Sequence, residues 1–187
     1  IFILVCAMMT SVSIVREKES GTMEVLLVSP VRPIKIIFAK MIPYFIISCI
    51  VLVTILLLAR YLLGVPMTGG VAGIFSLSLL YLMLSLSLGL LVSTITDTQM
   101  AALLISAMVM MMPILMLSGM LFPIENLPAF FQALSNIVPA RWYIDAVRKM
   151  MIQGEPITAV WQNCVILLVM TIAILGISLK KFNDKLE

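Results

Sequence analysis

The stretch VAGIFSLSLLYLMLSLSLGLLVSTI, residues 71–95, holds 25 residues without one charged side chain. An α-helix needs about 20 apolar residues to cross the hydrocarbon core of a bilayer, so this stretch is long enough to span a membrane. Its apolar residues are continuous and do not alternate with polar ones, which favours a helix over a barrel strand. The stretch therefore predicts a transmembrane helix.

Uncharged stretches recur on both sides of it, at residues 1–15, 41–59, 98–121 and 159–179. We expect the helix of 41–59 to continue to Leu63, and each of the last three stretches to span the membrane. The stretch 1–15 is shorter, and we interpret it as the end of a span that begins before residue 1. The sequence thus predicts an all-α polytopic membrane protein with five transmembrane helices in one transmembrane domain, residues 1–187.

The composition agrees with lipid surroundings. Hydrophobic residues make up 63% of the chain and charged residues 11%, whereas soluble domains carry about 25% charged residues. The net charge is only +3 and the basic residues do not cluster, which argues against nucleic acid as a partner. Cys6, Cys49 and Cys164 lie in apolar runs without metal-ligand spacing, so we interpret them as small hydrophobic side chains.

Lysine and arginine set the expected orientation, because they are enriched in cytoplasmic loops. With five crossings, one side carries Arg16, Lys18, Arg32, Lys35, Lys40, Lys180, Lys181 and Lys185, and the other carries Arg60, Arg141, Arg148 and Lys149. We therefore expect residues 16–40, the turn 96–98 and the C-terminus in the cytoplasm. The loop 122–158 is then extracytoplasmic.

The stretch REKESGTMEVLLVSPVRPIKIIFAK, residues 16–40, is unusually charged for this chain. We expect a short helix along the inner face of the membrane, with Glu17, Glu19 and Glu24 toward water, that ends at Ser29–Pro30. Gly21 permits a bend or a close backbone contact. Lys35 and Lys40 are expected to reach phosphate headgroups. A loop that only sets topology needs a few basic residues, so the added glutamates favour a docking surface.

The sequence of the extracytoplasmic loop 122–158 predicts two short amphipathic helices, neither of which is long enough to span the membrane. Asn126 is the expected N-cap of the first, with Pro128 just inside its start. Pro139 opens the second helix, which Gly154 ends. Asp145 stands four residues from both Arg141 and Lys149 and can pair with either. Trp142 and Tyr143 suit a membrane–water boundary.

The sequence lacks the motifs of an enzyme. It contains no GxxxxGK[ST], GxSxG or HExxH pattern and no histidine. An ATP-independent channel or copper transporter is the alternative function, because Met108, Met112, Met116 and Met120 recur every four residues and thioethers bind Cu(I). Flexible filler between helices, or a pliant substrate surface, explains the same methionines, and Pro113 is expected to kink their stripe.

Two stretches resemble those of a known family. ESGTMEVLLVSPV, residues 19–31, resembles the cytoplasmic signature of ABC-2 type transporter permeases, the membrane subunits of ATP-driven exporters. LSGMLFPIENLPAFFQALSNIVPARWYIDAVR, residues 117–148, is similar to the last outer loop of that family. The outer-loop residues that match are Phe122, Pro123, Glu125, Asn126, Pro128 and Pro139.

The resemblance implies the last five of six spans of such a permease. It implies that residues 16–33 form the coupling segment that docks on an ABC ATP-binding subunit, and that a second permease chain, identical or different, completes the pathway. ATP and Mg²⁺ would then bind the partner subunit, and this chain would bind no cofactor. The resemblance also implies a multi-pass protein of a bacterial inner membrane. The expected docking residues are Glu17, Glu19, Gly21, Thr22, Glu24, Leu26, Leu27, Ser29 and Pro30.

Overall fold

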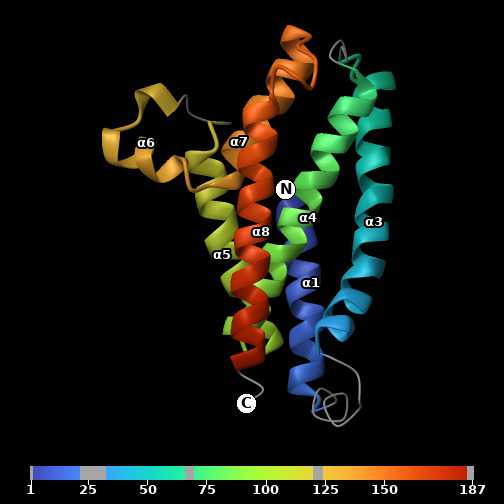
Figure 1. The fold of residues 1–187 in the computed structure, drawn as a ribbon, viewed down its shortest axis with the longest axis vertical. Helices are drawn as coiled ribbons and strands as arrows, with labels where there is room; N and C mark the ends of the chain where they lie inside the picture. The colour runs from blue at the N-terminus through green and yellow to red at the C-terminus, as the bar shows by residue number, and fades with distance from the viewer. Residues whose placement is uncertain (1, 22–32, 66–69, 120–123, 185–187) are drawn as a thin grey trace. The chain divides into compact units, whose positions relative to one another are not determined.

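The structure is a computed structural model that describes residues 2–21, 33–65, 70–119 and 124–184 (Figure 1). The described residues form helices and turns, with no strand among them, which confirms the all-α prediction. The elements are α1 (Phe2–Glu19), α3 (Pro33–Tyr61), α4 (Val71–Ile95), α5 (Gln99–Leu117), η1 (Ile124–Asn126), α6 (Ala129–Ser135), α7 (Pro139–Arg148), η2 (Lys149–Gln153) and α8 (Trp161–Asp184).

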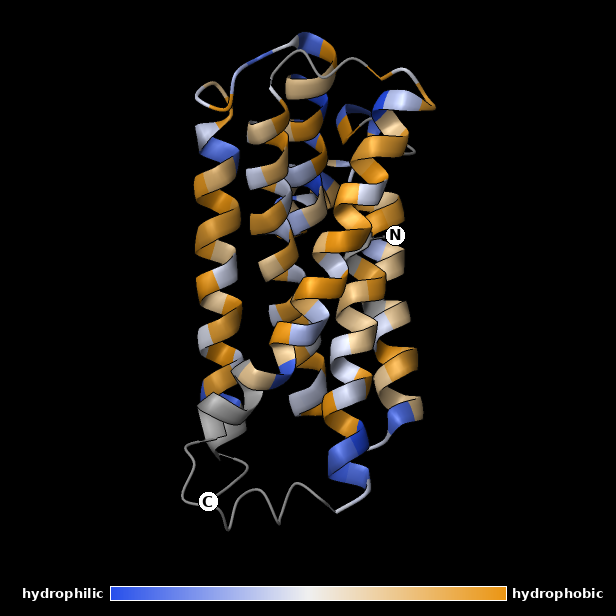
Figure 2. Ribbon diagram, turned by 90° about the vertical axis from the view of Figure 1, so that its right-hand side faces the viewer, coloured by the Kyte–Doolittle hydropathy of each residue, from blue (hydrophilic) through white to orange (hydrophobic). Residues whose placement is uncertain are grey.

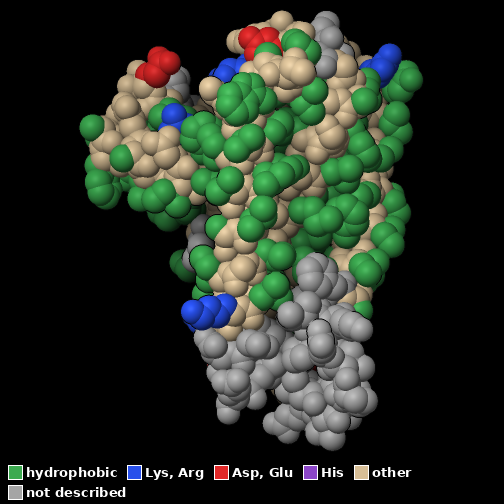
Figure 3. All heavy atoms as spheres, viewed as in Figure 1, with side chains coloured by type: hydrophobic (Ala, Val, Ile, Leu, Met, Phe, Trp, Pro, Cys, Tyr) green, Lys and Arg blue, Asp and Glu red, His purple; other side chains and the backbone are tan. Residues whose placement is uncertain are grey.

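Within the described ranges, four helices are long and apolar enough to cross a membrane: Ala39–Tyr61, Val71–Ile95, Gln99–Leu117 and Trp161–Lys181. Figure 2 shows these long helices as predominantly hydrophobic ribbons, and hydrophobic side chains cover much of the face drawn in Figure 3. They match the uncharged stretches that predicted them. Helix α1 is not among the four, so the number of five spans stays a prediction.

The chain divides into two compact units. The first comprises Ile1–Ser48, Leu82–Met110 and Thr171–Glu187, and the second comprises Cys49–Tyr81 and Met111–Met170. Helices α3, α4, α5 and α8 each contribute one part to either unit.

Helix α1 is a core element of the first unit, with Ala7, Thr10 and Val15 at most 1% exposed. It lies against α4 at Gly89, where a Cβ atom would be 2.5 Å from the carbonyl oxygen of Ala7. The absence of a side chain at Gly89 thus allows the close packing of α1 and α4.

Small polar side chains join α1 to other helices of the first unit. The Cys6 Sγ lies 3.0 Å from the Ser48 Oγ of α3, and the Ser11 Oγ lies 3.0 Å from the Ser106 Oγ of α5. All four side chains are buried. Cys6 therefore meets the expectation of a buried thiol, whereas Cys49 and Cys164 are half-buried.

Helix α4 is the most buried of the four candidate spans. In its most apolar stretch 61% of the residues are buried, against 17% in α3 and in α8. Four of its serines are buried: Ser78, Ser85, Ser87 and Ser93. The hydroxyls of Ser78, Ser87 and Ser93 donate to carbonyl groups one turn earlier in α4. Helix α4 therefore accommodates small polar residues without leaving those hydroxyls unpaired.

The second unit is organised around α7. Its Ala140 and Ala146 are almost completely buried, and Met150 of η2 is 0% exposed. A Cβ atom at Gly73 of α4 would lie 2.6 Å from the Met150 Cε, so glycine allows this methionine to approach α4. This close approach places η2 against the first half of α4.

Candidate functional site

The predicted coupling segment, residues 16–33, is described at 16–21 and at Pro33. Residues 22–32 lie outside the described residues, and with them Thr22, Glu24, Leu26, Leu27, Ser29 and Pro30. Residues 16–19 form the last turn of α1, so the expectation that they begin a separate helix along the membrane is wrong. Arg16–Glu19 are good helix formers and continue α1, which ends before Gly21 with its left-handed φ of 72°.

Glu17 forms an ion pair with Lys40 of α3. Both side chains are largely buried, with 33% of the Glu17 and 20% of the Lys40 side chain exposed. The expectations that Glu17 faces water and that Lys40 reaches lipid phosphates are therefore wrong. The pair instead ties the end of α1 to the beginning of α3.

Lys18 reaches the C-terminus of α4. Its Nζ donates to the carbonyl oxygens of Ser93 at 2.5 Å and of Thr96 at 3.4 Å. The last carbonyl groups of a helix have no partner within the helix, and a cation there interacts favourably with the helix dipole. Lys18 therefore caps α4.

Glu19 reaches the N-terminus of α5. Its Oε2 accepts hydrogen bonds from the backbone N–H of Gln99 at 3.2 Å and from the Gln99 side-chain amide at 2.8 Å. An anion at a helix N-terminus satisfies unpaired N–H groups and is stabilised by the dipole.

We name Glu17, Lys18 and Glu19 the α1 clasp. Three consecutive side chains connect the end of α1 to α3, α4 and α5 within the first unit. The sequence interpretation missed the contacts with α4 and α5, because they join residues 75 and 80 positions apart.

The outer loop contains the two short helices that the sequence predicted, α6 and α7. Pro139 opens α7, and Gly154, with a left-handed φ of 72°, caps the following π-helical turn η2. The prediction of Asn126 as N-cap is wrong, because Asn126 ends η1 and Pro128 occupies the N-cap position of α6. Glu125 lies in η1, and Phe122 and Pro123 lie outside the described residues.

Helix α7 is fixed by its aromatic and polar neighbours. The Tyr143 hydroxyl lies 2.9 Å from the Ser78 Oγ, and its ring stacks on Tyr81 with 4.0 Å between centroids. Burial raises the pKa of Tyr143 above its usual value, against a smaller opposite effect of the Ser78 hydrogen bond. Tyr143 thus packs against α4, whereas the sequence suggested a residue at the membrane–water boundary. The Asn163 side chain of α8 donates to the Trp142 carbonyl at 2.9 Å.

Asp145 pairs with Lys149, at 2.9 Å, one of its two predicted partners. It also accepts a 3.0 Å hydrogen bond from Asn163. Burial acts to raise the pKa of Asp145, but the hydrogen bonds of Asn163 and Lys149 and the charges of Lys149 and Arg148 outweigh it and hold the pKa below its usual value.

The described residues contain no cluster of three or more His, Cys, Asp or Glu side chains placed to hold a metal ion. The methionine stripe lies on the outside of α5, with Met108, Met112 and Met116 exposed by 73%, 68% and 51%. These three side chains therefore do not fill gaps between the described helices. Met120 lies outside the described residues.

Comparison with known proteins places this arrangement in a family. The model of the ABC-2 family transporter proteins matches residues 1–180. The chain is 30% identical over its full length to the probable multidrug ABC transporter permease YbhS of Escherichia coli (strain K12), covering 50% of that protein. It is 33% identical to YbhR, a probable multidrug ABC transporter permease of the same strain, over 87% of this chain and 44% of that one.

A third relative is ABC transporter G family member 20 of Dictyostelium discoideum, 30% identical over 94% of this chain and 24% of that protein. No solved structure matches the chain. The chain spans about half the length of the bacterial relatives it matches. It belongs to the ABC-2 family of transporter proteins, as the resemblance indicated, and is a multi-pass membrane protein.

Proposed function

We propose that the chain is part of a permease that exports a substrate across a bacterial inner membrane, driven by ATP hydrolysis in a separate ATP-binding subunit. A second permease chain, identical or different, completes the transport pathway. ATP and Mg²⁺ bind the partner subunit, since this chain has no phosphate-binding loop motif. The inner-membrane assignment is supported by the relative YhhJ of Escherichia coli, an inner membrane transport permease.

The observation that carries the proposal is the position of the α1 clasp directly before residues 22–32. A permease needs an element that receives force from an aqueous partner and passes it to several helices together. The α1 clasp, which includes the expected docking residues Glu17 and Glu19, connects the end of α1 to α3, α4 and α5 through an ion pair and charged hydrogen bonds. Displacement of residues 22–32 by an ATP-binding subunit would therefore act on three spans at once and bias a two-state arrangement of the helices.

The proposal is tested by the substitution Glu24→Lys in the whole transporter, reconstituted with its ATP-binding subunit. A reversed charge at a docking contact is expected to reduce ATP-dependent transport by about tenfold or more, since close charge pairs across interfaces carry more than 1.4 kcal/mol of coupling. Membrane insertion should not change. The matched control is Glu155→Lys, on the side predicted to be extracytoplasmic.

Normal transport and normal binding of the ATP-binding subunit by Glu24→Lys would contradict the docking role. Transport by the purified permease without an ATP-binding subunit would contradict the proposed function itself.

A further inference from the structure

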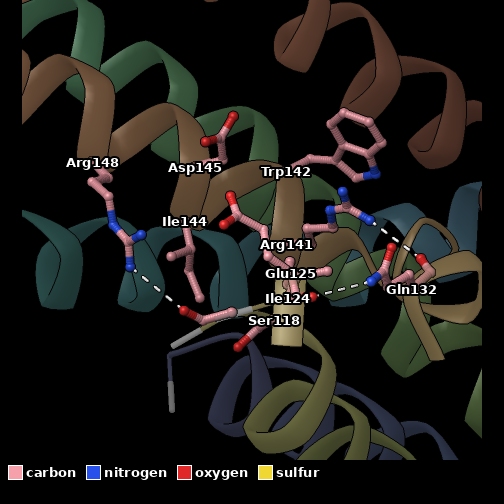
Figure 4. Close-up of a pocket in the computed structure, with 10 residues that line it drawn as sticks. Ser118, Ile124, Glu125, Gln132, Arg141, Trp142, Ile144, Asp145 and Arg148 are labelled. Carbon is pink, nitrogen blue, oxygen red and sulfur yellow. Dashed lines mark hydrogen bonds between the residues drawn. The ribbon is translucent and has the colours of Figure 1, made fainter. Parts of the chain in front are cut away.

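A cavity of about 390 Å³ lies within the second unit, where the end of α5, η1, α6 and α7 converge (Figure 4). Its lining is mixed, with polar, charged and aromatic side chains that include Ser118, Glu125, Gln132, Arg141, Trp142 and Arg148. Polar groups that converge in a concave site are typical of ligand binding.

Glu125 and Arg148 line this cavity with opposite charges, and the Arg148 charge also helps to lower the pKa of Asp145. Among the described residues, Glu125 has no ion pair, and Arg148 donates one hydrogen bond, a 3.5 Å contact with the Gly119 carbonyl. Both side chains are exposed. A guanidinium group has five N–H donors and a carboxylate about four acceptor positions, so most of their hydrogen-bonding capacity is free for a ligand.

Ser118 adds a third group. Its side chain is 2% exposed and lines the cavity, and its Oγ has no hydrogen-bond partner among the described residues. A buried hydroxyl without a partner costs free energy, so such a group needs an explanation. A polar ligand in the cavity supplies the missing partner.

The other two charged side chains of the cavity, Arg141 and Asp145, already have hydrogen-bond or ion-pair partners. Arg141 donates to Ser135 Oγ at 2.5 Å and to Asn136 Oδ1 at 2.6 Å. Asp145 is held by Lys149 and Asn163. Glu125, Arg148 and Ser118 are therefore the groups of the cavity with the most unused hydrogen-bonding capacity. The Trp142 ring beside them already has the Arg141 guanidinium 5.4 Å from its centroid.

The position along the chain indicates where the ligand comes from. Ser118 directly follows Leu117, the last residue of a helix that is long and apolar enough to cross a membrane, so the cavity lies beside the end of this candidate span. Helix α6 and the turn after it present exposed apolar side chains, with Phe130 exposed by 72% and Ile137 by 70%. We infer that this exposed apolar surface lies in the interface of the bilayer.

We propose that the cavity binds the zwitterionic phosphoethanolamine headgroup of a bilayer lipid. Arg148 and the Ser118 hydroxyl donate to the phosphate, and Glu125 accepts from the ammonium group. This site is independent of the ATP-driven function proposed above.

Native mass spectrometry of the purified permease tests the proposal through the dissociation constants of dioleoyl phosphatidylethanolamine and dioleoyl phosphatidylglycerol. The two lipids share the phosphate and the chains, but only the first has an ammonium group. Wild type is expected to bind phosphatidylethanolamine about tenfold more tightly, the effect of one charge-assisted hydrogen bond. Equal affinity of wild type for both lipids overturns the proposal without any variant.

Variants then separate the two halves of the headgroup. Glu125→Gln should weaken phosphatidylethanolamine alone and remove the preference, whereas Arg148→Gln should weaken both lipids about tenfold. The matched controls Arg60→Gln and Glu155→Gln, whose residues do not line the cavity, should change neither. A preference that survives Glu125→Gln contradicts the site.

Soluble glycerophosphoethanolamine distinguishes the source of the headgroup. It should displace the lipid only at much higher concentration, because it lacks the chains. If it binds as tightly as the lipid, the ligand is a soluble zwitterion and the lipid assignment is overturned.

Discussion

Replacing Gly89 with alanine should destabilise the first unit, because the new methyl group has no space. It would lie 2.5 Å from the Ala7 carbonyl oxygen and 2.9 Å from the Thr10 Cβ, whereas carbon and oxygen atoms in close contact are about 3.3 Å apart or more. The nearest atom belongs to the backbone of α1, so relief requires that α1 and α4 separate. Overpacking of this kind costs about 1–3 kcal/mol.

Gly176→Ala is the matched control. Gly176 is also a helical glycine of the first unit, but a Cβ atom there would meet no heavy atom within 4 Å. The better helix propensity of alanine should leave stability unchanged or raise it by about 0.5–1 kcal/mol.

Thermal unfolding in detergent, followed by dye reaction at the cysteines, measures both variants. Cys6 is 5% exposed and precedes Ala7, so its reaction reports on the affected contact. Gly89→Ala should lower Tm by several degrees, at about 2–4 °C per kcal/mol for a chain of this size. Equal melting temperatures for Gly89→Ala and Gly176→Ala would refute the close contact of α1 and α4.

Three further predictions follow from individual contacts. Lys18→Gln should weaken the capping of α4, and Glu19→Gln that of α5, by about 0.3–1 kcal/mol each. Weaker capping should be seen as faster amide hydrogen exchange at residues 93–99. Unchanged exchange would contradict the α1 clasp. Because the pKa of Asp145 is lowered in the folded protein, its ionised carboxylate stabilises the fold. This stabilisation is complete above the ordinary Asp pKa near 3.9 and is lost as the pH falls through the lower pKa of the folded state. The Tm of wild type should therefore approach that of Asp145→Asn below about pH 4, and a constant difference would contradict this linkage. Replacing the exposed side chains of Met108, Met112 and Met116 with leucine should leave copper tolerance of cells unchanged, and a copper phenotype would favour the alternative function of a metal path.

The sequence predicted the long helices well because each depends on a local property, the length of an uncharged stretch. The bounds Val71–Ile95 follow directly from the flanking Gly70 and the turn at Asp97. Pro139 and Gly154 likewise act on their own backbone, and their positions in α7 and η2 agree with the prediction.

The polar contacts of the site were not predictable in the same way. Glu17 was expected in water because carboxylates usually are, but its partner Lys40 lies on another helix. Neither Lys18 nor Glu19 stands near its partner in sequence, so no spacing rule identifies them as helix caps. Asn126 has a favourable N-cap side chain, yet the 3₁₀ turn Ile124–Asn126 moves the start of α6 beyond Pro128.

Site-specific photo-crosslinking from position 24 tests most directly whether this part of the chain meets an ATP-binding subunit. A photoreactive amino acid in place of Glu24 should form an adduct with that subunit in intact cells, and the same amino acid in place of Glu155 should form none. An adduct from position 155 and none from position 24, or labelling of position 24 from outside the cell, would contradict the central claim.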